Sequence, residues 1–372
     1  MATASDVSRL RAARLAAHGL AGGGLPSITA AVERLGAVQA QDLGAAKWVL
    51  GARVAGAREA DVDAAIESRA IVRTWPLRGT LHLMPAALVR PVLALTAPRE
   101  FRRLTTRHRD LGLDAAVVAE ARRIVVAELA ARTRTRDELF AAWEGAGIAT
   151  GGQRGYHLVW RFALEALVCC GPVDGRTQSF VLLDEWAPGP PAGAGDDARD
   201  ETLTRLLTAY ATGHGPVTVA DFAWWAGLTL GDARRARAVA GEALAEFDAE
   251  RLVAVGAEEP ARAAAAAAAR PGGRLALAAF DEYFLGYADR SVVCAPDDAR
   301  KVVPGGNGVF QPILVDRGWV TGTWRRRDTR GGTSVTLEGF GDAIAPGGYR
   351  RALEAWAAFR GVPLLALEAA DG

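Results

Sequence analysis

One stretch of the sequence decides the fold: residues 135–184 read TRDELFAAWEGAGIATGGQRGYHLVWRFALEALVCCGPVDGRTQSFVLLD. The pattern predicts, in order, a helix over 135–143, a turn over 145–152, a longer helix over 153–167, and two short strands around 167–170 and 179–184. A Gly-Pro-Val-Asp-Gly turn joins the two strands. Helix, turn, helix and β-wing in this order are typical of a winged helix-turn-helix unit.

The same order of elements recurs on both sides of this stretch. Before it, several predicted helices are followed by two alternating strands, 70–75 and 80–83, around a turn. After it, helices are predicted over 201–212, 218–226 and 231–240, and Thr218 begins a capping-box pattern, T-x-x-D. No close sequence repeat links the copies, so the recurrence of the pattern alone indicates several winged helices.

Beyond residue 273 the sequence changes to short strands separated by Gly, Pro and Asp turns. Examples are 275–280, 309–315, 319–324 and 333–337. Many short strands at this spacing indicate a small barrel or a sandwich. Asp281 and Glu282 follow the first of these runs. Adjacent residues on a strand point to opposite faces, so we expect these carboxylates to make a poor acid/base pair.

The composition is that of a soluble globular protein, with 372 residues of which half are hydrophobic and 23% charged. The longest featureless apolar run, 263–269, is far shorter than the ~20 residues of a membrane helix. The N-terminal residues lack the apolar segment of a signal peptide, so we expect a cytoplasmic protein without membrane contact. Three cysteines and five isolated histidines predict neither a disulfide framework nor a metal site, and no cofactor is expected.

The net charge of +1 hides an uneven distribution. Residues 1–140 carry 21 basic and 14 acidic side chains, and the remainder carries 23 and 29. The N-terminal excess of positive charge suits a polyanionic partner. An ordinary solvated surface carries such an excess too, and on charge alone this second interpretation is the favoured one.

An unusual tetrapeptide, Gln39-Ala40-Gln41-Asp42, lies between two predicted helices. In an extended stretch Gln39 and Gln41 point to the same side, and two amides on one face offer the donors and acceptors to hold a water molecule. The alternative is two solvent-exposed polar residues before Asp42, which is placed to cap the following helix.

Two clusters of basic residues lie on predicted β-hairpins. Arg73, Trp75, Arg78 and His82 occupy the first predicted wing, where guanidinium groups beside an aromatic ring suit a phosphate backbone. The alternative is a hairpin with a buried Trp and exposed Arg side chains, in which His82 is structural. The second cluster, 325–327, is three arginines at a hairpin tip, typical of a groove contact or of a solvated loop.

Taken together, six stretches in order along the chain carry a family resemblance: Arg34–Asp42, Val72–His82, Leu182–Trp186, Asp221–Leu228, Phe280–Tyr283 and Lys301–Phe310. They resemble the winged-helix DNA-binding family that contains the AlkZ-like DNA glycosylases. The resemblance implies an α+β fold with three tandem winged-helix domains, a small C-terminal β-barrel and a concave shape overall. The expected domains are winged helix 1 with the catalytic motif at 1–130, winged helix 2 at 131–195, winged helix 3 at 196–273 and the barrel at 274–372.

The resemblance also implies site residues and a partner. Its catalytic Gln-apolar-Gln motif falls on Gln39 and Gln41, whereas a sister group has an acidic residue at the second position. A β-hairpin of the barrel is expected to probe the DNA groove, and we assign this role to Arg325, Arg326 and Arg327. The implied partner is double-stranded DNA carrying alkylated purines. We expect a monomer that associates with the nucleoid through DNA binding.

The expected function is a monofunctional DNA glycosylase for bulky or crosslinked N-alkylated purines. A purine alkylated at N7 is already positively charged and leaves as a neutral molecule, so the enzyme needs mainly to orient a water at C1′. Gln39 and Gln41 would hold that water, and Asp42 would add negative potential or cap the helix. The resemblance further implies DNA alkylation repair, crosslink unhooking and antibiotic self-resistance. The alternative is a non-catalytic winged-helix DNA-binding protein or transcription regulator.

Overall fold

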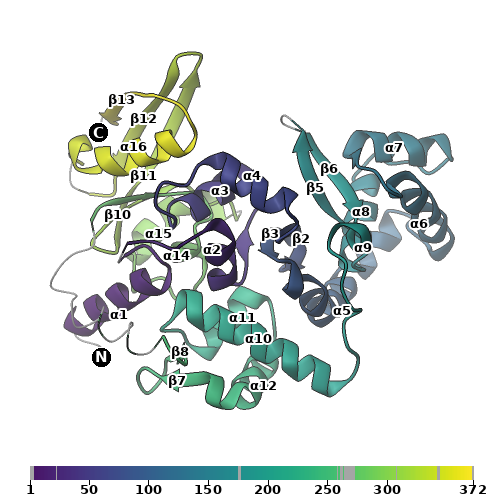
Figure 1. Cartoon of the computed structure of the whole chain (residues 1–372), viewed down its shortest axis with the longest axis horizontal. Coiled ribbons are helices and arrows are strands. Elements are labelled where there is room, and N and C mark those ends of the chain that lie inside the picture. Colours follow the sequence, from purple (N-terminus) through teal and green to yellow (C-terminus); the bar gives the residue numbers. More distant parts are fainter. Residues whose placement is uncertain are drawn as a thin grey trace. The chain divides into compact units, whose positions relative to one another are not determined.

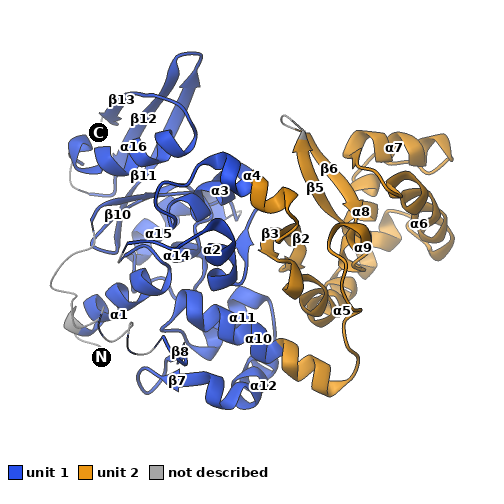
Figure 2. Cartoon of the chain, in the orientation of Figure 1, with its two compact units in different colours: residues 1–62, 203–372 blue, residues 63–202 orange. Residues whose placement is uncertain are grey.

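The computed structural model of the chain forms two compact units (Figure 2). Unit 1 comprises residues 1–62 and 203–372, and unit 2 comprises residues 63–202. The structure describes residues 4–21, 23–174, 177–257, 259, 263, 273–306, 308–341 and 344–370. Two helices, α4 (Glu59–Glu67) and α10 (Asp196–His214), labelled in Figure 1, change colour in Figure 2 because the borders between the units fall within them. The four-domain division expected from the sequence stays a prediction.

Unit 2 combines one antiparallel sheet with helices. Its elements are β2 (Ile71–Leu77), β3 (Thr80–Pro85), α5 (Ala86–Asp110), α6 (Ala115–Leu129), β4 (Arg134–Thr135), α7 (Arg136–Gly145), α8 (Arg154–Leu164), β5 (Val168–Asp174), β6 (Thr177–Leu182) and α9 (Leu183–Trp186). The strands run in the order β3-β2-β5-β6-β4. Both predicted strand pairs are therefore present, and they join through one sheet in which Arg73 lies opposite Cys170.

The decisive stretch folds in the predicted order of helix, turn, helix and hairpin. The Thr135 hydroxyl accepts a hydrogen bond from the backbone N–H of Glu138, and the Glu138 carboxylate accepts one from the backbone N–H of Thr135. This reciprocal pair is a capping box, and it starts α7. Trp143 is fully buried among the side chains of α6 and α8, and its indole N–H donates to the carbonyl of Ala121 at 3.0 Å. Burying this ring with its donor satisfied anchors the three helices to one core.

Unit 1 holds the chain's N-terminal helices and everything after residue 202. Its helical and short-strand elements before residue 273 are α1 (Ala4–Ala17), α2 (Ile28–Leu35), β1 (Val38–Gln39), α3 (Leu43–Gly51), α11 (Val219–Ala226), α12 (Leu230–Ala240), η1 (Gly241–Ala243), β7 (Leu244–Glu246) and β8 (Leu252–Ala254). The predicted capping box at Thr218 is present and starts α11. A β7–β8 hairpin follows α12, so this region also has helices followed by a strand pair.

The C-terminal part of unit 1 contains a sheet flanked by helices. Its elements are β9 (Leu275–Leu277), α14 (Glu282–Leu285), α15 (Pro296–Val302), η2 (Pro304–Gly306), β10 (Ile313–Asp316), β11 (Trp319–Thr329), β12 (Gly332–Gly339), η3 (Pro346–Tyr349), α16 (Arg350–Phe359) and β13 (Leu364–Ala369). Leu10 and Leu15 of α1 join the core that this sheet forms with Tyr283 and Val320. The N-terminal helix and the C-terminal sheet therefore belong to one folding unit.

The expected C-terminal β-barrel is not confirmed: the residues that the structure describes form no closed barrel. The strands run in the order β13-β12-β11-β10-β9, which leaves β13 and β9 as open edges. β13 lies parallel to β12, and a parallel neighbour requires a crossover, which α16 supplies. This helix contacts both β9 and β13, so it fills the position in which the two edges would have to meet.

Two further expectations from the sequence are corrected. The carboxylate pair does not lie on a strand: Asp281 is the N-cap of α14 and accepts a hydrogen bond from the backbone N–H of Tyr283. The sequence pattern also predicts a short strand at 301–303, but these residues form the end of α15, which Pro296 begins. A helix that the sequence predicts over 258–270, a charged and then poly-Ala stretch, falls almost wholly outside the described residues.

The described residues contain neither a membrane-spanning helix nor a cluster of metal-binding side chains. No helix there is both long and apolar enough to cross a membrane. Within the same ranges, no group of three or more His, Cys, Asp or Glu side chains is placed to hold a metal ion.

Candidate active site

The Gln-Ala-Gln motif lies between the end of α2 and the start of α3. Gly36 ends α2 at φ +75°, and a Cβ there would come within 3.1 Å of the Ala209 side chain, so this turn favours glycine. Gln39 ends β1 with 6% of its surface exposed, whereas Gln41 is exposed. Asp42 caps α3 by accepting a hydrogen bond from the backbone N–H of Ala45 at 3.0 Å, as the sequence predicts.

A buried carboxylate holds the first residue of this motif. The backbone N–H of Gln39 donates to Oε1 of Glu282 at 3.0 Å. The second oxygen, Oε2, accepts the indole N–H of Trp225 at 3.0 Å and lies 3.3 Å from Nε2 of His214. Because hydrogen bonds to charged groups are stronger than neutral ones, this fully buried side chain fixes the backbone at Gln39.

The neighbouring carboxylate is bound by a buried guanidinium. Arg53 donates from Nη2 to Oδ1 of Asp281 at 2.8 Å and from Nη1 to Oδ2 at 3.0 Å. Both side chains are fully buried, and the bidentate geometry compensates part of the cost of removing two charges from water. Since Arg53 follows α3 and Asp281 caps α14, the pair ties the helix behind the motif to the helix that carries Glu282.

Two histidines complete this buried network. Nε2 of His18 lies 2.9 Å from the hydroxyl of Tyr287, which itself donates to the carbonyl of His214 at 2.6 Å. Tyr287 therefore accepts from His18, whose Nδ1 faces a donor of Arg53 at 3.3 Å. Burial lowers the pKa of His18 well below its usual value, and His214 and Arg53 lower it further. Burial also lowers the pKa of His214, against the opposing effect of its hydrogen bond to the Glu282 carboxylate.

The basic residues of the first hairpin, β2–β3, are held within unit 2. Arg73 is buried and donates to Oε1 of Gln178 at 2.6 Å. Arg78 lies in the turn between the strands at φ +53°, and its guanidinium is 3.5 Å from Nε2 of His82. Nδ1 of the buried His82 is 2.9 Å from the Thr80 carbonyl, so Nδ1 carries the proton and Nε2 faces Arg78.

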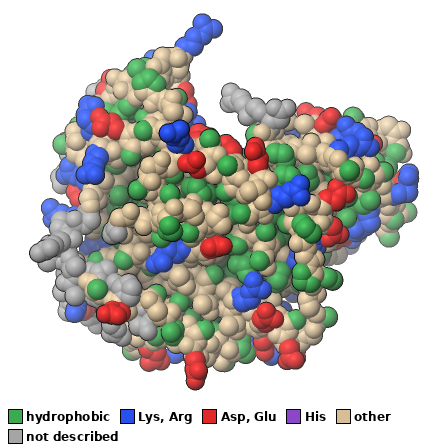
Figure 3. Space-filling model, viewed as in Figure 1, with side chains coloured by type: hydrophobic (Ala, Val, Ile, Leu, Met, Phe, Trp, Pro, Cys, Tyr) green, Lys and Arg blue, Asp and Glu red, His purple; other side chains and the backbone are tan. Residues whose placement is uncertain are grey.

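The second basic cluster lies on the long β11–β12 hairpin of unit 1. Arg325, Arg326 and Arg327 follow one another on β11 and are all exposed. Arg326 forms an ion pair with Asp328 at 3.3 Å. Basic side chains project at the outer end of this hairpin in the space-filling view (Figure 3). The arginines are thus presented to solvent on paired strands rather than on an irregular loop.

A comparison with known families decides the class of this site. Residues 32–359 match the family described as DNA glycosylase AlkZ-like, a range that includes the motif and almost all of its buried network. The chain belongs to the AlkZ-like DNA glycosylase family. It is therefore an enzyme of the DNA glycosylase class.

This AlkZ-like chain is similar to proteins of Streptomyces sahachiroi. It is 29% identical to an interstrand DNA cross-link repair glycosylase over 316 residues, which are 80% of this chain and 82% of that relative. Its fold is similar to that of the S. sahachiroi DNA glycosylase AlkZ, with a TM-score of 0.80 and 24% identity over 98% of this chain and 99% of that one. The structural likeness confirms the mixed fold of helices and strands.

Reasoning from the sequence missed the network beneath the AlkZ-like motif. Glu282 and Asp281 were expected on a strand, and no role was predicted for His18 or His214. A signal was available: two adjacent carboxylates interrupt the apolar run 275–285. Acidic side chains are rarely buried unless they are paired, so their presence inside an apolar run indicates partners from elsewhere in the chain.

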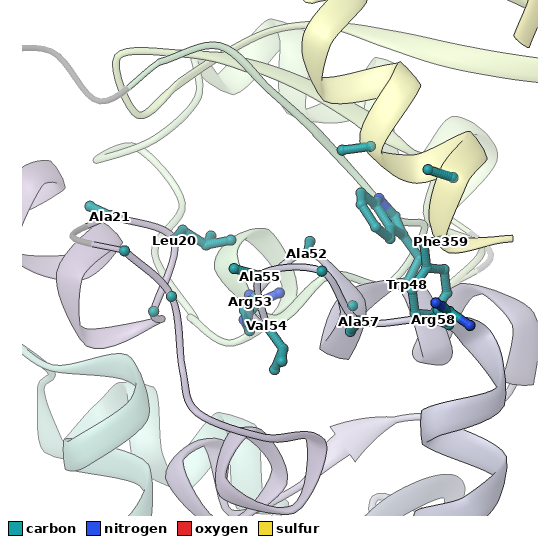
Figure 4. Close-up of a pocket in the computed structure, with 17 residues that line it drawn as sticks. Leu20, Ala21, Trp48, Ala52, Arg53, Val54, Ala55, Ala57, Arg58 and Phe359 are labelled. Atoms are coloured by element: carbon teal, nitrogen blue, oxygen red, sulfur yellow. The ribbon is translucent and has the colours of Figure 1, made fainter. Parts of the chain in front are cut away.

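A pocket of about 460 Å³ is lined by Arg53 and by residues at the end of α3, the helix that follows the motif (Figure 4). Leu20, Val54 and Phe359 contribute to its walls. Within the described chain its lining is apolar apart from Arg53 and Arg58. Arg53 is already bound to Asp281, and the described lining residues include no carboxylate, imidazole or thiol that could act as an acid or base.

Proposed function

We propose that this chain hydrolyses the N-glycosidic bond of bulky or crosslinked N-alkylated purines in double-stranded DNA, and that Gln39 and Gln41 position the attacking water. The observation that carries the proposal is the hydrogen bond between the Gln39 backbone and buried Glu282. A motif that orients water must be held rigidly, because a displacement of about 1 Å can cost a factor of ~100 in rate.

The two glutamines differ in exposure, and this suits a division of labour. Gln39 is nearly buried and held from behind, so its amide is the fixed partner of the water. Gln41 is exposed and precedes the capped start of α3, so its amide meets the incoming DNA. Each amide offers an oxygen that accepts and an NH₂ group that donates, which is sufficient to orient one water without a general base.

The reaction balances without an added acid. Alkylation at N7 leaves a positive charge on the purine, so breaking the bond between C1′ and N9 releases a neutral base and leaves positive charge on the sugar. Water adds to C1′ and loses its proton to solvent, which produces an abasic site. Amide oxygens of Gln39 and Gln41 facing the developing charge lower the barrier electrostatically. The buried Glu282 carboxylate behind Gln39 adds negative potential to the same place.

DNA contacts come from arginines on the two hairpins in this proposal. Arg325, Arg326 and Arg327 are exposed on β11 and suit the phosphate backbone or a groove. Arg78 is presented by the β2–β3 turn, where His82 orients it. Arg73 is buried and bound to Gln178, so its role is to shape the surface near Trp75 rather than to reach a phosphate directly.

The biological setting follows from the relative that acts on interstrand cross-links. We propose that crosslinked or bulky purine adducts are the substrates here too, and that the protein associates with the nucleoid as a monomer. Protection against a self-made alkylating antibiotic is the narrower form of this proposal. We also propose that the protein surrounds the duplex with the concave surface that the family resemblance implies.

Release of alkylated base from a duplex tests the proposal. Wild-type protein is incubated with a duplex carrying a single 7-alkylguanine, and free base and abasic sites are quantified together with DNA affinity. Equal yields of 7-alkylguanine and abasic site are expected, without strand cleavage by the enzyme itself. Tight binding with no release, for simple and for crosslinked adducts alike, would favour the non-catalytic DNA-binding alternative.

A further inference from the structure

A second pocket, of about 430 Å³, lies entirely within unit 2, and its lining includes neither Gln39 nor Gln41. Its volume is within the range of small-molecule sites, which is about 300–1,000 Å³. The lining residues that matter here are Arg73, Trp75, Tyr156, Thr177, Gln178 and Phe180. They come from β2, β6 and α8, so rigid elements rather than loops form most of the walls.

One wall of this pocket is a preorganised polar pair. Arg73 is buried, with 8% of its surface exposed, and donates to Oε1 of Gln178 at 2.6 Å. The Gln178 NH₂ group donates to the carbonyls of Gly171 and Ser179, both at 2.8 Å. The two backbone bonds fix the Gln178 amide, and its oxygen in turn holds the Arg73 guanidinium. Binding at this wall therefore requires little side-chain ordering.

Another part of the pocket lining is aromatic. Trp75 and Tyr156 meet edge to face, with ring centroids 6.4 Å apart and planes at 76°. Tyr156 is 39% exposed, so one ring remains available to a ligand. The buried indole N–H of Trp75 has no hydrogen-bond partner among the described residues. A buried donor without a partner is costly, so an acceptor placed beside it is favoured.

The pocket is built for binding rather than for covalent chemistry. The thiol of Cys170 also lines it. Burial raises the pKa of Cys170 to about 11, although Arg73 opposes the shift. The thiol therefore stays protonated near neutral pH, and the thiolate is the form that reacts.

We infer that this pocket binds a planar aromatic group that carries a hydrogen-bond acceptor. The inference rests on the proposed function, because it names a recognition element for the same DNA substrates. Such a group has two sources in that setting: the aromatic substituent of an alkylated purine, or a nucleobase that has left the stack. Both offer a flat ring to Tyr156 and an acceptor to the Arg73 wall.

Equilibrium binding separates the two sources. Three duplexes of one sequence are compared: one with N7-(4-carbamoylbenzyl)guanine, one with 7-methylguanine, and one unmodified. A 2′-fluorine on the lesion sugar slows base loss during the titration. The variants are Tyr156→Ala, which removes the exposed ring, and Thr177→Trp, which fills the pocket from an exposed position. Tyr156→Phe and Thr106→Trp, the latter on the exposed side of α5, are the matched controls.

Wild-type protein is expected to bind the aromatic adduct about tenfold more tightly than 7-methylguanine, the value of one stacking contact. Tyr156→Ala and Thr177→Trp abolish this preference, and both controls retain it. If the two variants weaken all three duplexes about equally, the occupant is an unstacked nucleobase. Equal affinities of wild type for the three duplexes, unchanged in both variants, would overturn the inference. Preference for the aromatic adduct without base release from the unfluorinated duplex would instead contradict the proposed function alone.

Discussion

The backbone N–H of Gln39 is hydrogen-bonded to the Glu282 carboxylate at 3.0 Å, although 243 residues separate the two along the chain. Glu282 also receives the indole N–H of Trp225, so one buried side chain joins β1, α11 and α14 within unit 1. The proposed catalytic motif of this AlkZ-like enzyme therefore rests on a residue that lies far away in sequence.

Replacing the supporting carboxylate should impair catalysis more than binding. Glu282→Gln keeps an oxygen for the Gln39 N–H but sets an NH₂ group against the indole N–H of Trp225. We expect the single-turnover rate of base release to fall at least about tenfold, with DNA affinity changed less than about twofold. Glu338→Ala, at an exposed position on β12, is the control and should match wild type. Parallel losses of rate and affinity would mean that Glu282 only holds the fold.

The buried ion pair should be essential to stability. Arg53→Met leaves the Asp281 carboxylate buried without its bidentate partner, and we expect the free energy of unfolding to fall by about 3–5 kcal/mol. Asp281→Asn added to Arg53→Met removes the stranded charge and should recover part of that loss. Chemical denaturation of the four proteins in the double-variant cycle measures the coupling. Strictly additive losses would contradict a direct interaction.

Stability should decrease as the pH falls below about 6.5, the ordinary pKa of histidine. Burial lowers the pKa of His108 to about 4, and His157 and Arg161 contribute to the shift. Between these two pH values the unfolded chain binds a proton that folded His108 excludes, so the stability is present above the window and is lost within it. His108→Asn should flatten the dependence of unfolding free energy on pH, whereas exposed Thr106→Ala should not. An unchanged slope in His108→Asn would show that other groups dominate.

The arginines of the β11–β12 hairpin should govern the salt dependence of DNA binding. Arg325 and Arg327 lie two residues apart on β11, so their side chains leave the same face of the strand. Replacing both with Ala should weaken binding to any sequence and reduce the slope of log Kd against log salt concentration by about 2. Arg9→Ala, at an exposed position on α1, is the control. Fluorescence anisotropy over a salt series measures the slope, and an unchanged slope would remove this hairpin from the interface.

Local sequence patterns predicted the elements that local physics determines. Thr218 and Asp42 cap helices as their spacing indicates, because the cap bonds form within three residues of the chain. The alternation of the β2–β3 and β5–β6 pairs was equally readable. The open C-terminal sheet was not, because its edges are determined by where α16 packs, and that is a contact between distant segments.

The candidate site also has one part that the sequence predicted and one part that it did not. The motif at Gln39 and Gln41 was found from two amides at a spacing of two residues. Glu282 was missed because α14 is only four residues long, and strand periodicity around it was the stronger local pattern. The sequence left open whether Trp75 packs inward or stacks on a ligand. In the structure it is buried, with 3% of its surface exposed, because helices that lie elsewhere in the sequence cover it.

Single-turnover release of 7-alkylguanine by wild type, Gln39→Ala, Gln41→Ala and the double variant tests the central claim most directly. Gln311→Ala serves as a control for loss of a glutamine side chain outside the motif. Each single substitution should slow release by about 100-fold, and the double variant should be no worse than a few-fold below either, because both amides hold one water. DNA affinity should remain within about twofold of wild type. Release at the wild-type rate by the double variant, with affinity intact, would contradict the claim that these two glutamines position the attacking water.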